Sequence, residues 1–485
     1  MWSRTDLRFQ LKRARGLLTI LVRNRRAAVG LFLLLGAIFV ALAAPLIAPV
    51  PPLAVASGAM AQPEWVTAFP DGYYLSKNLV VVSDPYFTTP AAVQAWSWST
   101  VPSGVTDLFV SHSTKGFLGN GTSGSLQIVY TGSGPRNFTL AQTFRYPYHG
   151  PPASFIDSIA MRVAQSNDTV LARVFVIRGS DDFTLNNVND TNVRPTQIWV
   201  QAQNQTIKQT GVKTSLSAAQ ILFSGIGNYT FGVQLTFTGP AQVNIGRLQL
   251  QLYGTAYGLL GTDIQGHDMW SQDVFGSRVS LFVGLTATAI GISLGLIIGL
   301  LAGFLGKLVD ELLMRFTDMM LVIPSLPLLI VLVAVLGQTL TNVILIIGFL
   351  GWMGFARIIR SQVLTIRERP FVEAAKAAGS GNLRIIARHI FPNIVSLTYV
   401  NLALSVPVAI LTETALAFIG LSDPTVVSWG NVYHNAENAQ VFFLNPPPWW
   451  WLVPPGIGIS LLALSFILIG FALDEIFNPR LRRRR

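Results

Sequence analysis

Long runs of apolar residues divide the chain into a membrane part and a polar part. Six runs are long enough to cross about 30 Å of hydrocarbon as α-helices, which takes about 20 residues each. They occupy residues 27–50, 279–305, 308–337, 341–360, 394–420 and 452–473. The pattern predicts a bundle of six transmembrane helices, in which a long polar stretch separates the first helix from the other five.

Residues 51–258 show a different pattern, in which apolar and polar positions alternate among many Thr, Ser, Asn, Gln and Gly residues. A period of two is typical of a strand with one buried face, and it is clearest near Tyr229. The same pattern predicts strands at residues 158–163, 171–177, 197–203, 229–238 and 243–253. We therefore expect an extracytoplasmic all-β domain, either a sandwich or a jelly roll.

Polar groups and prolines inside the apolar runs are candidates for the translocation path. Pro324 and Pro327 interrupt the third run and predict a kink, because proline cannot donate a helical hydrogen bond. Asp318 and Glu413 are acids within apolar runs, where ionisable groups are costly and commonly functional. A structural hydrogen bond from Glu413 to a neighbouring helix is an equally good interpretation.

The composition identifies an integral membrane protein. Hydrophobic residues make up 51% of the chain and charged residues 12%, against about 25% charged in soluble domains. There is no cysteine, which excludes disulfides and thiolate metal sites. The first apolar run is longer than a signal peptide's core, so we expect a helix that is not cleaved.

The net charge of +11 could suggest nucleic acid as a partner, but the placement of the basic residues argues against it. They gather at Arg4–Arg26, Arg357–Arg388 and Arg480–Arg485, each beside an apolar run. This is the positive-inside pattern. It predicts cytoplasmic termini, with residues 1–26 as an amphipathic segment on lipid headgroups and residues 474–485 as a basic tail.

The polar loop at 361–393 predicts two short helices beside the membrane. Phe371–Ala378 is rich in alanine, and Gly379–Gly381 should break the helix. A second helix should start with Asn382 as its N-cap and stop at Pro392.

This second helix has two faces that could bind a partner. Leu383, Ile386 and Ile390 recur at helical spacing, and Arg384 and Arg388 lie on another face. We expect the apolar ridge to dock in a groove of a partner protein, with the charges fixing the register. An ordinary solvated helix is the alternative.

The order of residues in this loop resembles the EAA motif of permease subunits of ABC importers. The motif falls on Glu373, Ala374, Ala375, Gly379, Ile390 and Pro392. His389 and Phe391 depart from the general pattern, although His389 before Ile390 is similar to the dipeptide and oligopeptide branch, in its second-permease type. The resemblance implies that the loop, with Arg384 and Arg388, is the coupling segment that docks on an ATPase.

A second stretch resembles the Gly-Thr-Asp-x-x-Gly-Arg-Asp signature of the same branch. It consists of Gly261, Thr262, Asp263, Gly266 and Asp268, with His267 in place of the Arg. Three of these side chains, Asp263, His267 and Asp268, could be imagined around a metal ion. We instead expect turn and cap residues, and no metal site.

The resemblance implies that this chain and the ATPase are separate subunits of one importer. No Gly-x-x-x-x-Gly-Lys-Ser/Thr, His-Glu-x-x-His or Gly-x-Ser-x-Gly occurs in the chain, so we expect no ATPase or other enzyme site here. ATP and Mg would be held by two partner ATPase subunits or domains, and this chain would bind no cofactor. The other implied partners are a second homologous permease, an extracellular substrate-binding protein and membrane lipids.

The same resemblance predicts six transmembrane helices of the type I importer fold, with residues 259–473 as the five-helix permease core. The β-rich domain at 51–258 would be an insertion that captures the binding protein, contacts sugars or serves as a spacer. We expect uptake of oligopeptides or oligosaccharides. The alternative is a membrane-anchored adhesion or sensor protein whose β-domain carries the function.

Six Asn-x-Thr sequons lie in the β-rich stretch. They are Asn120, Asn137, Asn167, Asn189, Asn204 and Asn228. Their confinement to the part expected outside predicts N-glycosylation and favours an archaeal plasma membrane. Coincidence in a domain rich in Asn and Thr is the alternative.

Overall fold

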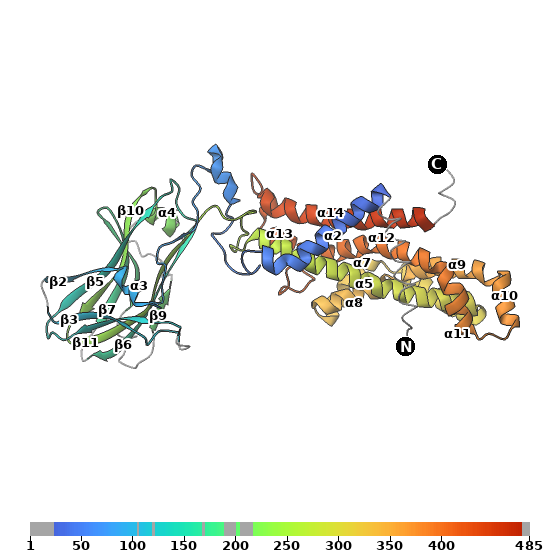
Figure 1. Cartoon of the computed structure of the whole chain (residues 1–485), viewed down its shortest axis with the longest axis horizontal. Coiled ribbons are helices and arrows are strands. Elements are labelled where there is room, and N and C mark those ends of the chain that lie inside the picture. The colour runs from blue at the N-terminus through green and yellow to red at the C-terminus, as the bar shows by residue number, and fades with distance from the viewer. Residues whose placement is uncertain are drawn as a thin grey trace, which may run out of the picture. The chain divides into compact units, whose positions relative to one another are not determined.

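The computed structural model describes residues 24–103, 106–118, 122–166, 170–188, 200–203 and 217–477. These residues form two compact units (Figure 1). The outer unit runs from Val55 to Asp268, and the membrane unit contains the described residues up to Ala54 and from Met269 onward. The β-rich domain was expected to end at residue 258. The compact outer unit instead continues to Asp268 and includes the 261–268 signature.

The outer unit contains two antiparallel sheets. One sheet has the order β3-β4-β11-β6-β9 with β1 paired to β11, and the other has the order β2-β5-β10-β7-β8. The strands are β1 (Leu79–Val80), β2 (Ser97–Val101), β3 (Leu108–Ser113), β4 (Ser125–Tyr130), β5 (Arg136–Tyr146), β6 (Ser154–Ser166), β7 (Val170–Arg178), β8 (Asp181–Val188), β9 (Val200–Gln203), β10 (Gly227–Phe237) and β11 (Ala241–Tyr253). Short helices accompany them: η1 (Glu64–Ala68), η2 (Pro70–Gly72), α3 (Pro90–Gln94) and α4 (Ala218–Leu222).

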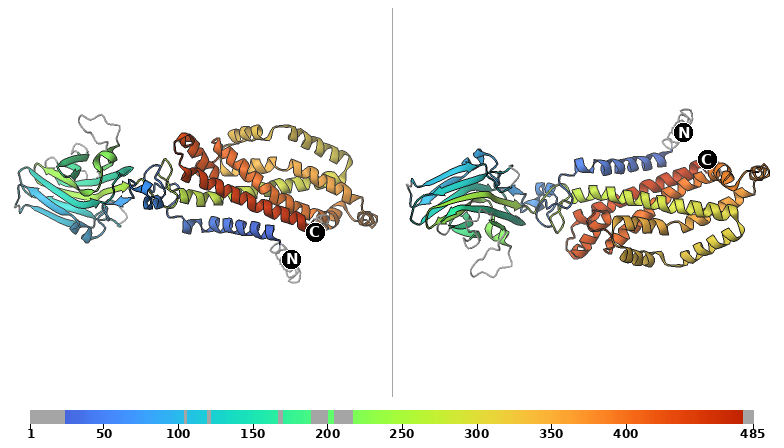
Figure 2. Two further views of the ribbon diagram at one scale, coloured as in Figure 1. Left: turned by 90° about the horizontal axis from the view of Figure 1, so that it is seen from above. Right: turned by 90° about the horizontal axis from the view of Figure 1, so that it is seen from below.

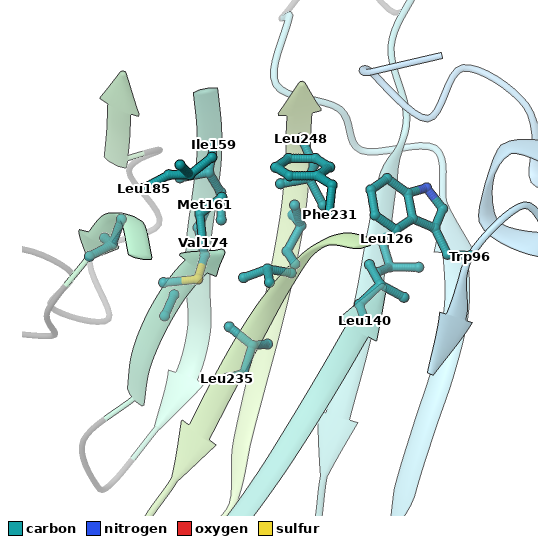
Figure 3. Close-up of a cluster of buried hydrophobic side chains, with 14 of the residues drawn as sticks. Trp96, Leu126, Leu140, Ile159, Met161, Val174, Leu185, Phe231, Leu235 and Leu248 are labelled. Atoms are coloured by element: carbon teal, nitrogen blue, oxygen red, sulfur yellow. The ribbon is translucent and has the colours of Figure 1, made fainter. Parts of the chain in front are cut away.

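The two sheets share one hydrophobic core, part of which Figure 3 shows. Alternate residues of each strand face inward, so one sheet contributes Val174, Phe231 and Leu235 and the other contributes Leu126 and Leu248. Three of the five predicted strand segments fall within β6, β7 and β11, and a fourth, residues 229–238, overlaps β10 and extends one residue beyond its end at Phe237. The fifth overlaps β9, and its residues 197–199 lie outside the described residues. Strands β1 to β5 and β8 were not predicted.

One polar pair is buried in this apolar core. Asp157 of β6 and Asn186 of β8 are each 1% exposed, and the Asn186 side-chain amide donates to the Asp157 carboxylate. Burial raises the pKa of Asp157 to about 6. The carboxyl therefore holds its proton more tightly in the folded unit than in water.

The two ends of the outer unit meet each other. Val55 forms a β-bridge with His267, and the Ala56 N–H donates to the Gly266 carbonyl at 2.8 Å. A Cβ at Gly266, whose φ is +81°, would come within 2.3 Å of the Ser57 carbonyl oxygen, so only glycine fits there.

The membrane unit is helical. Its elements are α2 (Arg25–Ile47), α5 (Met269–Leu305), α6 (Lys307–Val322), α7 (Ser325–Leu336), α8 (Leu340–Leu350), α9 (Met353–Arg367), α10 (Pro370–Ala377), α11 (Asn382–Ile385), a π-helical turn (Ile386–Ile390), α12 (Phe391–Phe418), α13 (Trp429–Asn438), η4 (Val441–Phe443) and α14 (Trp449–Phe477).

Among the described residues, five helices or helix pairs are long and apolar enough to cross a membrane, and α6 with α7 makes a sixth candidate that is bent by 89°. The break lies at Ile323 and Pro324. Pro324 immediately precedes α7, and Pro327 is the third residue of that helix, where a backbone N–H would have no helical partner. The predicted kink is therefore a nearly right-angled break.

Helix α5 packs closely on α9 through glycines. A Cβ on Gly295 would lie 2.7 Å from the Trp352 carbonyl oxygen, and one on Gly299 would lie 2.6 Å from that of Ala356. Small residues let two backbones approach in this way. On the other side of the bundle α14 lies alongside α12, as both views of Figure 2 show.

Candidate functional site

The loop between α9 and α12 has a backbone geometry that only its glycine allows. Helix α10 ends at Ala377 with Ala378 as its C-cap, and Gly379 follows with a φ of +73°. The Ser380 N–H donates to the Ala375 carbonyl at 3.1 Å, and the Gly379 N–H donates to the Lys376 carbonyl at 2.9 Å. This pair of bonds is a Schellman motif, which explains in physical terms why the EAA pattern has a glycine at this position.

Three residues anchor the loop on the bundle. Val372, Ile385 and Ile390 are completely buried. They form one apolar cluster with residues of α5 and α9, namely Phe304, Phe355, Ile359 and Val363. The loop is thus fixed to the membrane helices, so a displacement of the loop would be passed to α5 and α9.

The opposite face of the loop is exposed. It presents Glu373, Ala374, Arg384, Arg388 and Pro392, together with Leu383. Phe371 and Phe391 of the loop are exposed as well. A surface that combines exposed apolar side chains with charges of both signs suits docking on a folded partner.

Three predictions about this loop were wrong in detail. Ile390 belongs to the buried anchor, so Leu383, Ile386 and Ile390 do not form one exposed ridge. Asn382 is the first residue of α11 rather than its N-cap. Pro392 does not stop a helix, because it lies in the first turn of α12, where proline is tolerated, and the π-helical turn joins α11 to α12.

Asp318, a predicted pathway residue, is paired with a cation from another helix. Its carboxylate on α6 accepts a hydrogen bond from Arg357 of α9. A second pair joins the same two helices, because Arg360 donates to both oxygens of Asp310 at 2.5 and 2.6 Å. The roles of Arg357, Arg360 and Asp310 were missed by the sequence reasoning, since the partners are 39 and 50 residues apart.

A cavity of about 230 Å³ lies among α5, α7, α8 and α12. Four hydroxyl groups line it among mostly apolar residues: Thr288, Ser325, Ser405 and Thr412. Ser325 directly follows Pro324, so the helix break places a polar residue on the cavity wall.

Glu413 does not line this cavity. It is completely buried in α12, where its carboxylate neighbours the side chain of Ser428. Ser428 caps α13 by accepting from the Asn431 N–H at 3.2 Å. Neither oxygen of the Glu413 carboxylate has a hydrogen-bond partner among the described residues, so the pathway role and the structural role of Glu413 both stay predictions.

The signature residues at 261–268 form a closed turn in the outer unit. The Asp263 carboxylate accepts from the backbone N–H groups of Gln265 and His267 at 2.8 and 2.9 Å, and its second oxygen lies 2.9 Å from Nδ1 of His267. Thr262 accepts from the Ala61 N–H and donates to the Gly58 carbonyl. Gly261 has a φ of +67°, and Asp268 is fully buried. These contacts favour turn and cap roles.

Two of the six sequons lie among the described residues. Asn228 of β10 is exposed, whereas Asn137 of β5 is half-buried, and its side-chain oxygen accepts from Thr236 at 2.9 Å. Asn120, Asn167, Asn189 and Asn204 lie outside the described residues.

Comparison with known proteins identifies the family. Residues 295–483 match the family of the binding-protein-dependent transport system inner membrane component. A putative peptide transport system permease protein of Brucella suis is 37% identical over 237 residues, which are 49% of this chain and 78% of the relative. The chain belongs to this family of ABC importer permeases. Permeases of this family have no ATPase site of their own, and ATP is hydrolysed on a separate partner.

Two further relatives of this permease come from other bacteria. The dipeptide transport system permease protein of Alkalihalophilus pseudofirmus is 35% identical over 59% of this chain and 90% of the relative. The oligopeptide transport system permease protein of Bacillus subtilis is 34% identical over 46% of this chain and 72% of the relative. The permease therefore belongs with the dipeptide and oligopeptide branch, as the EAA and Gly-Thr-Asp motifs indicated.

Solved structures resemble parts of the permease only weakly. The MetNI methionine ABC transporter in an inward-facing conformation matches 44% of this chain and 97% of that chain, with 17% identity and a TM-score of 0.34. The carbohydrate-binding module TmCBM61 in complex with β-1,4-galactotriose matches 36% and 97%, with 12% identity and a TM-score of 0.24. Likenesses at this level carry no argument about ligands.

Proposed function

We propose that this permease is one of two membrane subunits of a peptide importer, and that its 361–393 loop couples transport to ATP hydrolysis on a partner. The observation that carries the proposal is the two-sided loop. One side is anchored on α5 and α9 by Val372, Ile385 and Ile390, and the other exposes Glu373 and Arg384. The peptide substrate is supported by the relatives, which are named for peptide, dipeptide and oligopeptide transport.

Coupling follows from a two-state argument. ATP closes the dimer formed by two ATPase subunits or domains, and the docked loop moves with it. Because α9 and α12 continue from the loop, the helices change between inward and outward access. The second, homologous permease supplies the other wall of the path, and an extracellular binding protein delivers the substrate.

The same proposal includes an orientation of the chain in a plasma membrane. Both termini and the 361–393 loop lie in the cytoplasm, and the outer unit lies outside the cell, in agreement with the distribution of arginines. The exposed Asn228 is accessible for N-glycosylation, and the sequons support an archaeal source. Mass spectrometry of glycopeptides from the native host tests this, and bare asparagines at all six sites would contradict it.

The coupling role is tested by exchanging the charge on the exposed face. Glu373→Lys should reduce co-purification of the ATPase by about tenfold or more, since a charge-assisted contact would become repulsive. Val372→Ala at the neighbouring buried position is the matched control for damage to the loop. Unchanged association in Glu373→Lys would argue strongly against the coupling assignment.

The substrate is tested by uptake into vesicles that contain the whole importer. Labelled peptides presented on the binding protein should accumulate only when ATP is supplied. An oligosaccharide, the other substrate class expected from the sequence, provides the comparison. Accumulation of the sugar without the peptide would reject the peptide assignment.

A further inference from the structure

The cavity among α5, α7, α8 and α12 has a closed end and an open end. Thr288 and Ile292 line the closed end, where each is only 5% exposed. Ser325, Gly351 and Val408 also line the cavity, but these three residues are exposed and therefore mark its opening. The cavity is thus a pocket that a group from outside this chain can enter.

The Thr288 side chain lacks the hydrogen bond that other threonines of these helices make. Thr286 and Thr412 donate to the carbonyl oxygens four positions earlier, those of Phe282 and Val408, at 2.6 and 2.7 Å. Oγ1 of Thr288 has no hydrogen-bond partner among the described residues. Since buried polar groups are nearly always hydrogen-bonded, this hydroxyl group indicates that the pocket receives a polar ligand.

The first turn of α7 supplies further donors at the opening of the pocket. Ser325 is the first residue of this 12-residue helix, and no side chain caps the helix at this end. The first N–H groups of a helix have no partner within it, and the helix dipole favours a negative charge there. In transporters, the N-terminal ends of broken helices face anionic groups of the solute in this way.

The wall of the pocket limits the chemistry of its ligand. The described residues that line it include no acidic and no basic side chain. An ammonium group would therefore find no carboxylate as a partner, whereas a carboxylate would meet hydroxyl and N–H donors. The volume of about 230 Å³ is below the roughly 300–1,000 Å³ of sites that enclose a whole small ligand. The pocket suits one carboxylate together with one apolar side chain.

We propose that this pocket receives the carboxyl-terminal residue of a peptide in transit. Thr288 donates to the peptide carboxylate, and the N-terminal end of α7 stabilises its negative charge. The apolar part of the wall, which includes Ile292, Leu329 and Ile347, contacts the side chain of that residue. This inference rests on the proposed function, because it takes the solute to be a peptide.

The first test measures binding to the whole importer in detergent, without transport. The chain has no cysteine, so Val408→Cys places its only thiol at the opening of the pocket. Leu411→Cys is the matched control, because Leu411 is also an exposed residue of α12 but does not line the pocket. The reaction of each thiol with a water-soluble methanethiosulfonate is followed by the mass of this subunit.

A free tripeptide should slow the reaction of Val408→Cys about tenfold once it occupies about 90% of the pockets. The C-amidated form of the same tripeptide should have no effect, because it lacks the carboxylate. Neither form should change the reaction of Leu411→Cys.

The second test measures uptake of both forms into vesicles from a saturated binding protein. Thr288→Val replaces the unpartnered hydroxyl group by a methyl group. It should lower uptake of the free tripeptide about tenfold relative to the C-amidated form. Thr286→Val makes the same change on α5 at a hydroxyl group that donates to its own helix and does not line the pocket. This control should change uptake of neither form.

The outcomes distinguish this inference from the proposed function. The inference is overturned if the thiol of Val408→Cys does not react, or if the two tripeptides protect it equally or not at all. An equal effect of Thr288→Val on uptake of the two forms overturns it as well. If the unmodified importer takes up neither tripeptide from its binding protein, it is the proposed function that fails.

Discussion

Gly379 and Gly381 are two residues of the same loop that place different demands on the backbone. A Cβ added to either glycine would meet no atom within 4 Å, but Gly379 has a φ of +73° whereas Gly381 has a φ of −67°. Gly379→Ala should therefore cost about 1–2 kcal/mol through strain alone, and Gly381→Ala should be nearly neutral. We expect ATPase co-purification to weaken several-fold only in Gly379→Ala. Equal effects in both variants would contradict the Schellman explanation.

Asp157 makes the stability of the outer unit depend on pH. Its pKa is about 6 in the folded unit against an ordinary value of 3.8, so the folded state binds the proton more tightly between these values. The free energy of unfolding should then fall by an amount on the order of 3 kcal/mol as the pH rises from about 4 to about 6, and stay constant above. Hydrogen exchange of β6 and β8 amides, corrected for intrinsic rates, measures this.

Asp157→Asn is the control for this pH dependence, because an amide does not titrate. In this variant the opening free energy of β6 and β8 should not change over the same pH range. If the opening free energy of Asp157→Asn changes with pH as it does in the unmodified chain, another group causes the pH dependence.

At the scale of elements, the anchor and the exposed face of the 361–393 loop should respond differently to truncation. Ile390→Ala removes a fully buried side chain and should cost about 2–5 kcal/mol. Leu383→Ala shortens a side chain that is 79% exposed and should leave stability unchanged while weakening ATPase association. Thermal unfolding in detergent and co-purification measure the two effects. Loss of stability in Leu383→Ala would show that this face is not free.

Sequence patterns predicted the elements better than their contacts. The helix breaks at Gly379 and Pro324 follow from local backbone chemistry, which a sequence displays directly. Ile390 has the same helical spacing whether it faces a partner or the bundle. Only its packing in the buried cluster with Ile359 shows that it faces the bundle. Likewise the Asp318–Arg357 pair joins residues that are 39 positions apart, and no local pattern contains that proximity.

The two units of the whole chain should be separable. The outer unit has its own core and joins its ends at Val55 and His267. In the membrane unit, Trp270 donates to the Ile47 carbonyl at 3.1 Å, which holds the start of α5 beside the end of α2. We expect residues 55–268 to fold alone, with strand-rich circular dichroism and a cooperative thermal transition. An excised segment without such a transition would contradict this.

The complementary deletion tests the role of the outer unit. A short linker in place of residues 55–268 should leave a bundle that still binds the ATPase, because the loop anchor lies wholly in the membrane unit. Reduced association with the binding protein would support a capture role, and unchanged association would support a spacer.

The position of β11 also determines the order in which the outer unit can be completed during synthesis. This strand is the last of its sheet to be made, yet it lies between β4 and β6 and also pairs with β1. At 5–20 residues per second, roughly 10 to 35 seconds separate the synthesis of Leu79 from that of Tyr253. In the last part of that interval, about 4 to 15 seconds from Ser166 to Ala241 at the same rate, β4 and β6 have both been made and each has an edge that lacks β11, and such edges readily aggregate. We therefore expect that biogenesis of this permease requires protection of the half-made sheet until the segment just before α5 arrives.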